Sequence, residues 1–169
     1  FQRFPKVYWI FNHRVWVLET HPAVNWVNEL LLVAKIHKAD PRNFHGWTYR
    51  RYIIGQMSKT QDLTIQEFDY TTRMINANFS NFSALHNRTK LIPVMFEKNL
   101  IADTPVEFFK KELEYLHNAM FTDPEDQGVF LYLRWILTSD VFVKGISTVE
   151  YLEILKQELS LIHELNELE

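Results

Sequence analysis

The sequence predicts an all-α protein made of antiparallel helix pairs that stack as an α-solenoid. A sequence pattern recurs along the chain at a spacing typical of such proteins. Apolar residues follow a helical period, and no segment alternates as a strand does. Only four Gly and six Pro interrupt a chain of 169 residues that is 47 % hydrophobic, which excludes disorder and turn-rich β folds.

The repeat has four copies, which begin 36, 38 and 45 residues apart. Their cores are residues 5–16, 41–52, 79–90 and 124–135. The first column of the repeat is aromatic in three copies: Tyr8, Phe44 and Phe82. The second, three residues later, holds large apolar residues: Phe11, Trp47, Leu85 and Phe130.

Arginine follows the second column after another three or four residues. These arginines are Arg14, Arg50, Arg51, Arg88 and Arg134. Residues at this spacing share one helix face, so both columns and the arginines are expected in one packed stripe. Because the arginines recur with the core aromatics, we interpret them as structural residues that bond neighbouring helices, and we reject a phosphate-binding role.

Segments between the copies have the periodicity of partner helices, which gives seven or eight helices. Asp40-Pro41 and Asp123-Pro124 resemble an N-cap followed by proline at the first helical position. Helices are therefore expected to start near Pro5, Pro41, Ser80 and Pro124, and the last to run from about Thr148 to Leu168. No linker is evident, so one domain is expected over residues 1–169. Its ends indicate a piece truncated on both sides.

Composition excludes several functional classes. A net charge of −3 provides no field for nucleic acid, and the absence of cysteine removes disulfides and thiolate metal sites. No apolar run is long enough for a transmembrane segment. The seven histidines contain no pair at zinc-binding spacing, so no metal is expected in this chain.

The repeat core, an Asn-aromatic pair followed by Trp and Arg, resembles that of protein prenyltransferase α subunits. Residues 42–51, 78–83 and 121–127 look like the Rab geranylgeranyl version, and residues 5–9 look like a fungal member. The resemblance covers essentially the whole chain. It implies tetratricopeptide-like repeats that form a right-handed superhelix.

The resemblance also implies the function of an α subunit in a cytoplasmic heterodimer, inactive alone. That enzyme transfers geranylgeranyl from its diphosphate to C-terminal cysteines of Rab GTPases in vesicular transport. A β subunit is expected to supply zinc and most catalytic residues, geranylgeranyl diphosphate to bind at the subunit interface, and a Rab escort protein to present the substrate.

Four residues match positions that line the active-site cleft in this family. Lys6, in Pro5-Lys6-Val7-Tyr8, matches a lysine that contacts the isoprenoid diphosphate, where an ammonium stabilises the leaving group. The alternative is a solvated lysine near a helix start. Tyr8, Phe44 and His45 match cleft-lining positions. His45 could bond the diphosphate or a substrate carboxylate, or be an ordinary inter-helix histidine.

Two other functions remain open. The chain could be the α subunit shared by farnesyl and type I geranylgeranyl enzymes, although the motifs around residues 42–51 and 122–127 favour the Rab type. It could also be an interaction scaffold of the helical-repeat class, which presents peptides and needs no enzyme partner. Co-purification separates these classes, because a scaffold needs no β subunit.

Overall fold

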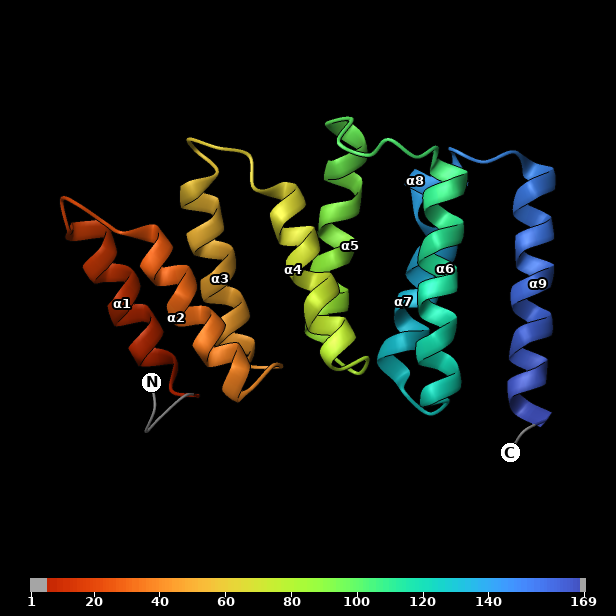
Figure 1. The fold of residues 1–169 in the computed structure, drawn as a ribbon, viewed down its shortest axis with the longest axis horizontal. Coiled ribbons are helices and arrows are strands. Elements are labelled where there is room, and N and C mark those ends of the chain that lie inside the picture. Colours follow the sequence, from red (N-terminus) through yellow and green to blue (C-terminus); the bar gives the residue numbers. More distant parts are fainter. Residues whose placement is uncertain (1–5, 168–169) are drawn as a thin grey trace. The chain divides into compact units, whose positions relative to one another are not determined.

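The computed structural model describes residues 6–167, which form nine α-helices and no β-strand (Figure 1). The helices are α1 (Tyr8–Thr20), α2 (Trp26–Ala39), α3 (Phe44–Met57), α4 (Thr64–Ala77), α5 (Phe82–Glu97), α6 (Pro105–Thr122), α7 (Gln127–Thr138), α8 (Asp140–Val143) and α9 (Thr148–Glu167). The all-α prediction is confirmed. The sequence missed α8, because four residues are too few to establish a helical period.

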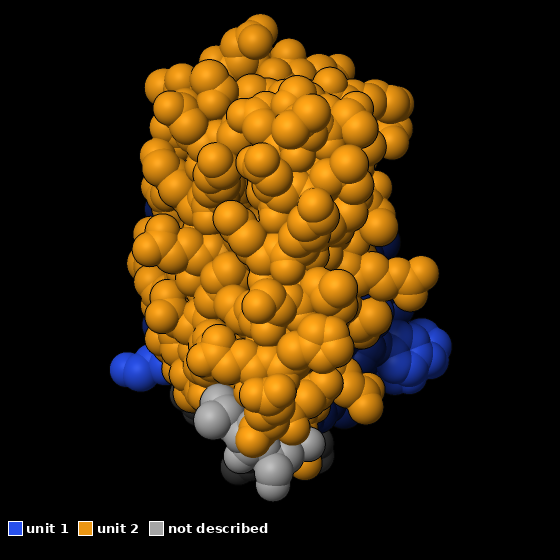
Figure 2. All heavy atoms as spheres, turned by 90° about the vertical axis from the view of Figure 1, so that its right-hand side faces the viewer, with its two compact units in different colours: residues 1–67 blue, residues 68–169 orange. Residues whose placement is uncertain are grey.

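The chain divides into two compact units, residues 1–67 and 68–169 (Figure 2). The first contains α1, α2, α3 and the first turn of α4, and the second contains the rest of α4 and α5 to α9. Successive long helices within each unit run antiparallel, as expected for helix pairs. A single domain over residues 1–169 stays a prediction.

The core of the first unit forms where α3 packs against α1 and α2. Its buried side chains are Phe11, Val33, Ile36, Tyr49, Ile53, Met57 and Leu63. In α3 these residues recur every three to four positions, so one face of the helix turns inward. Hydrophobic burial therefore fixes the orientation of α3, and with it the position of the residues at the start of that helix.

The core of the second unit is aromatic and aliphatic. Its most deeply buried side chains include Phe109, Phe142, Ile75, Ile92, Leu116, Met120, Val129 and Ile136. The ring of Phe142, from the short α8, lies 4.6 Å from that of Phe109 and 6.2 Å from that of Trp135, so α8 caps the α6–α7 pair. Aromatic pairs at these separations add stabilisation beyond the area they bury.

The helices of the repeat start two to three residues later than expected. Asp40 and Asp123 are not N-caps. They end α2 and α6, and a turn of three residues follows each of them. The N-caps are Asn43 and Asp126, and the side chain of Asn43 accepts a hydrogen bond from the backbone N–H of Gly46 at 2.9 Å. The start expected near Pro5 falls outside the described residues, and α1 begins at Tyr8.

The two aromatic columns of the repeat do not share a packed stripe. The second column is buried in three copies, where Phe11, Trp47 and Leu85 are at most 5 % exposed. The first column is exposed instead: Tyr8 at 45 %, Phe44 at 69 % and Phe82 at 56 %. Its residues stand at the first position of their helices, where no preceding turn covers them.

Within residues 6–167, no helix has the length and hydrophobicity needed to cross a membrane. The same residues contain no cluster of three or more His, Asp or Glu side chains placed to hold a metal ion.

Candidate functional site

A pocket of about 310 Å³ lies beside the turn between α2 and α3. Its lining residues are Lys6, Asp40, Arg42, Asn43, Phe44 and His45. Three of the four residues singled out from the sequence therefore lie together: Lys6, Phe44 and His45. Tyr8, the fourth, is not a lining residue, but its ring lies 6.5 Å from that of His45.

The turn between α2 and α3 fixes the wall of this pocket. The backbone N–H of Asn43 donates to the carbonyl of Asp40 at 3.0 Å, which closes the turn. The indole N–H of Trp47 donates to the carbonyl of Pro41 at 2.9 Å and ties the turn to α3. The large residue of the second column therefore holds in place the loop that carries the pocket residues.

The pocket carries more positive than negative charge. The ammonium of Lys6 and the guanidinium of Arg42 are balanced only by the carboxylate of Asp40, which lies 3.3 Å from Nζ of Lys6. The side chain of Lys6 is 78 % exposed, so its ammonium remains accessible to a ligand. The N-terminus of α3 also favours an anion here.

Aromatic rings form the other side of the site. His45 stacks on Phe11 at 5.6 Å, and its ring meets Phe44 edge-on at 5.7 Å. These contacts hold the imidazole between the core and the surface. The large exposed ring of Phe44 offers an apolar surface next to the cations, a combination that suits a ligand with an anionic head and a hydrocarbon tail.

Sequence reasoning missed Arg42. The signal was in the repeat alignment, because Lys6 and Arg42 each follow the proline that opens their copy, and the fourth copy has Glu125 there. The register therefore places a cation at this position in the first two copies. It gave no indication that both cations belong to one pocket, since that depends on the path of residues 6–8 beside α3.

Three arginines of the repeat, each three residues after the second column, bond a glutamate of the following helix. Arg14 donates to Glu29 at 2.6 and 2.7 Å, Arg50 bonds Glu67, and Arg88 donates to Glu112 from Nε at 2.8 Å. In each case the first helix of a pair supplies the arginine and the second supplies the glutamate. Planar, two-pronged contacts of this kind are among the stronger ion pairs in proteins.

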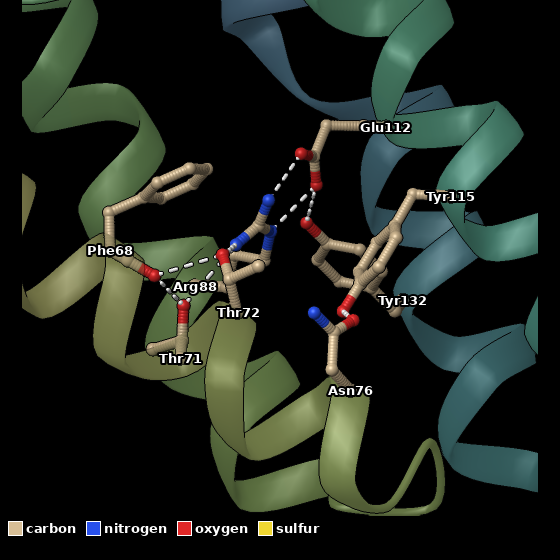
Figure 3. Close-up of polar contacts among 8 residues, drawn as sticks. All are labelled: Phe68, Thr71, Thr72, Asn76, Arg88, Glu112, Tyr115 and Tyr132. Carbon is tan, nitrogen blue, oxygen red and sulfur yellow. Dashed lines mark hydrogen bonds and ion pairs between the residues drawn. The ribbon is translucent and has the colours of Figure 1, made fainter.

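A tyrosine from the following helix joins two of these pairs. The hydroxyl of Tyr132 donates to Glu112 at 2.6 Å, and that of Tyr49 donates to Glu29 at 2.6 Å (Figure 3 for Glu112). Each carboxylate therefore links three helices: its own, the one before and the one after. Register alone predicted the arginine column, but the glutamates lie in segments with no recognisable motif and were missed.

Burial, charge and hydrogen bonding shift the pKa of Glu29 and that of Tyr132. Burial alone would raise the pKa of Glu29, but hydrogen bonds from Arg14 and Tyr49 outweigh it and hold the pKa below its ordinary value. Burial and the carboxylate of Glu112 raise the pKa of Tyr132 well above its ordinary value. Glu29 therefore stays ionised, and Tyr132 remains protonated as a hydrogen-bond donor.

Two arginines depart from this pattern. Arg134, expected to be buried and bonded to a neighbouring helix, is exposed on α7, and the arginine position of its repeat is occupied by the buried Leu133. Arg51 is also exposed, and its guanidinium donates to Thr48 of the same helix at 2.9 Å. Both lie one position past the buried column, which rotates them about 100° around the helix axis and out of the packed face.

Without an arginine at position 133, the fourth repeat holds its glutamate differently. Glu158 of α9 is 4 % exposed and lies 2.9 Å from Nε2 of His117 in α6. His117 lies in α6, the second helix of the third pair. In the other repeats the partner of the glutamate lies in the first helix of the glutamate's own pair.

The protein prenyltransferase alpha subunit repeat matches residues 26–57, 65–95 and 109–140, more than half of the chain. The chain belongs to this family. Each matched span covers most of two successive helices, the second helix of one pair and the first helix of the next pair. These are α2–α3, α4–α5 and α6–α7. Three of the four repeat cores found in the sequence fall within these spans, and the first, residues 5–16, precedes them.

Several relatives are named geranylgeranyl transferase type-2 subunit alpha. The protein from Saccharomyces cerevisiae is 44 % identical over 158 residues, which cover 90 % of this chain and 48 % of the yeast protein. The one from Candida albicans is 38 % identical over 99 % of this chain and 54 % of its own length. The rat protein is 40 % identical over 79 % of this chain and 24 % of its own length. The chain thus spans about half the length of its fungal relatives.

Proposed function

We propose that the chain is part of the α subunit of a cytoplasmic type-2 geranylgeranyl transferase, which modifies C-terminal cysteines of Rab GTPases. The family repeats and the names of the fungal and mammalian relatives support this proposal. The single observation that carries a role for this chain in the chemistry is the convergence of Lys6, Arg42 and His45 on one pocket.

Lys6 provides the chemical role. Negative charge grows on the diphosphate as its bond to the isoprenoid carbon breaks, and an ammonium already in position stabilises that charge. The ammonium is exposed, and the ring of Phe44 beside it gives an apolar surface for the hydrocarbon. Zinc, which activates the substrate thiol in such enzymes, and most of the isoprenoid pocket are assigned to the β subunit.

Exposed aromatic residues in each compact unit provide contact sites for that β subunit. Tyr8 and Phe44 are exposed in the first unit and Phe82 in the second, although aromatic side chains of this size are normally buried. Aromatic residues concentrate in the cores of stable protein interfaces. A Rab escort protein completes the proposed assembly by presenting the Rab substrate.

Co-expression of the full-length chain with a β subunit tests the proposal. The pair is expected to co-purify and to transfer geranylgeranyl to a Rab–escort complex. A peptide ending in a single prenylation cysteine distinguishes the farnesyl and type I enzymes, because those accept it without an escort protein. A chain that is soluble and monomeric in the presence of every β subunit tested would instead be an interaction scaffold.

Lys6→Ala tests the role of the pocket in the assembled heterodimer. One charge-assisted hydrogen bond contributes roughly 1.5–3 kcal/mol, so the single-turnover rate at saturating geranylgeranyl diphosphate is expected to fall about tenfold or more. Lys59→Ala is the matched control, because Lys59 is an exposed lysine whose ammonium bonds Gln56 of its own turn. If both variants transfer at the wild-type rate, Lys6 is a solvated lysine.

A further inference from the structure

Asp40 faces the proposed diphosphate site with a negative charge. Its two carboxylate oxygens serve different groups: Oδ1 accepts from the backbone N–H of Arg42 at 3.3 Å, and Oδ2 lies 3.3 Å from Nζ of Lys6. The first contact belongs to the turn. The second joins the carboxylate to the ammonium that is assigned to the diphosphate.

The turn does not need the charge of Asp40. Asn78 occupies the same place between α4 and α5, where its Oδ1 accepts from the backbone N–H of Ser80 at 3.0 Å. The backbone bond that closes the turn is also the same: Asn81 N–H to the carbonyl of Asn78 at 3.0 Å. A neutral amide therefore supports this turn elsewhere in the chain, and the turn does not account for the carboxylate at position 40.

We propose that Asp40 is a positioning residue that competes with the diphosphate for Lys6, and this inference rests on the proposed function. The side chain of Asp40 is only 27 % exposed and is anchored by the turn, whereas that of Lys6 is 78 % exposed. In the absence of a diphosphate, Asp40 holds the ammonium beside the pocket. When a diphosphate binds, its oxygens displace the carboxylate, whose charge then opposes the bound anion.

This competition has a defined consequence for substrate and product. A nearby carboxylate weakens the binding of any anion to Lys6, and it acts on inorganic pyrophosphate as well as on geranylgeranyl diphosphate. Pyrophosphate has no hydrocarbon to hold it in the site, so its affinity depends more on charge. Asp40 therefore favours release of the pyrophosphate after each transfer.

Asp40→Asn in the full heterodimer tests the inference, since the amide can keep the turn bond as Asn78 does. Exposed ion pairs are modest, so at low salt the variant is expected to bind inorganic pyrophosphate about two- to fivefold more tightly, measured as product inhibition of transfer. The gain is expected to shrink as salt is added. Asp123→Asn is the matched control, because Asp123 occupies the corresponding turn between α6 and α7.

A double variant separates competition for Lys6 from a general field effect. In a Lys6→Met background, Asp40→Asn is expected to change pyrophosphate affinity by less than about 1.5-fold, because the contested ammonium is absent. The inference is overturned if Asp40→Asn leaves affinity unchanged or weakens it, or if it tightens binding equally with and without Lys6. The proposed function fails separately, through a Lys6→Met variant that transfers at the wild-type rate.

Discussion

Replacing Arg88 by methionine removes the cation from a buried carboxylate while it keeps much of the apolar stem. Arg88 is 4 % exposed, and its guanidinium bonds Glu112 and, at 2.7 Å, the hydroxyl of Thr72 (Figure 3). The guanidinium also lies over the ring of Phe68, 3.8 Å from its centroid. Methionine can maintain the packing against that ring but cannot bond the glutamate.

The expected loss follows from what remains around Glu112. The carboxylate is 4 % exposed and keeps only the hydrogen bond from Tyr132 among the contacts described above. Removing one partner of a buried ion pair typically costs about 3–5 kcal/mol, because the other charge is left in a poorly solvated place. Domains of this size have total stabilities of about 5–15 kcal/mol, so the variant is expected to be near the limit of folding at 37 °C.

Urea unfolding of residues 1–169, followed by circular dichroism, measures this loss. Arg134→Met is the matched control, since the exposed guanidinium of Arg134 is expected to contribute less than about 0.5 kcal/mol. Adding Glu112→Gln to Arg88→Met removes the stranded charge and keeps an acceptor for Tyr132. The double variant is therefore expected to regain more than half of the lost free energy of unfolding.

Two results would refute this reasoning. Arg88→Met could unfold within about 1 kcal/mol of the wild type, which would mean that the carboxylate finds water or another partner at no cost. Alternatively, Glu112→Gln could fail to rescue Arg88→Met. The loss would then come from packing around the guanidinium rather than from the isolated charge.

Three further predictions concern local features. In α3, Gly46→Ala places a methyl 2.9 Å from Nε2 of His37 and is expected to destabilise the fold by about 1–3 kcal/mol. The methyl of Gly55→Ala meets no atom within 4 Å, so this variant is expected to stabilise the fold by about 0.5–1 kcal/mol. Thermal unfolding distinguishes the two variants. Thr104→Ala breaks the capping box of α6 and is expected to lower the free energy of unfolding, measured in urea, by about 1 kcal/mol. An unchanged free energy of unfolding would contradict the capping role of Thr104. Burial and the charge of Arg50 lower the pKa of His37 from 6.5 to about 4. The stabilisation of the folded state by neutral His37 is therefore fully present above pH 6.5 and is lost as the pH falls toward 4. Unfolding free energy is expected to be about 2 kcal/mol lower at pH 5 than at pH 7, with a weaker dependence in His37→Gln.

Local periodicity was enough to predict the long helices and the register of the repeat. Phe11, Trp47 and Leu85 are buried as their spacing required, because a helix exposes or buries residues according to position alone. Helix starts were predicted two to three residues too early. An Asp-Pro pair fits both an N-cap and a turn, and here the turn forms while Asn43 and Asp126 cap the helices three residues later.

The sequence predicted less about the site, since the site depends on contacts between segments. Lys6 and His45 were chosen from the resemblance, but only the folded chain places Arg42 and Asp40 in the same pocket. The partners of the arginines were missed for the same reason. Glu29 and Glu112 look like ordinary surface residues of amphipathic helices until the neighbouring helix covers them.

The Arg–Glu contacts give two of the three matched repeats a polarity, with consequences for how such chains lengthen by duplication. The span 26–57 begins with the acceptor Glu29 and ends with the donor Arg50, and the span 65–95 likewise runs from Glu67 to Arg88. A tandem copy of either span, inserted directly after the original, would therefore place an arginine beside a glutamate at both of its junctions.

The span 109–140 begins with the acceptor Glu112 but ends with Leu133 in place of the donor. A second copy placed directly after it would bury a glutamate opposite a leucine. In this chain the glutamate that follows the span is Glu158, and its carboxylate contacts His117 instead of an arginine. Duplication is thus expected to be tolerated after residue 57 or 95, and to need a compensating cation after residue 140.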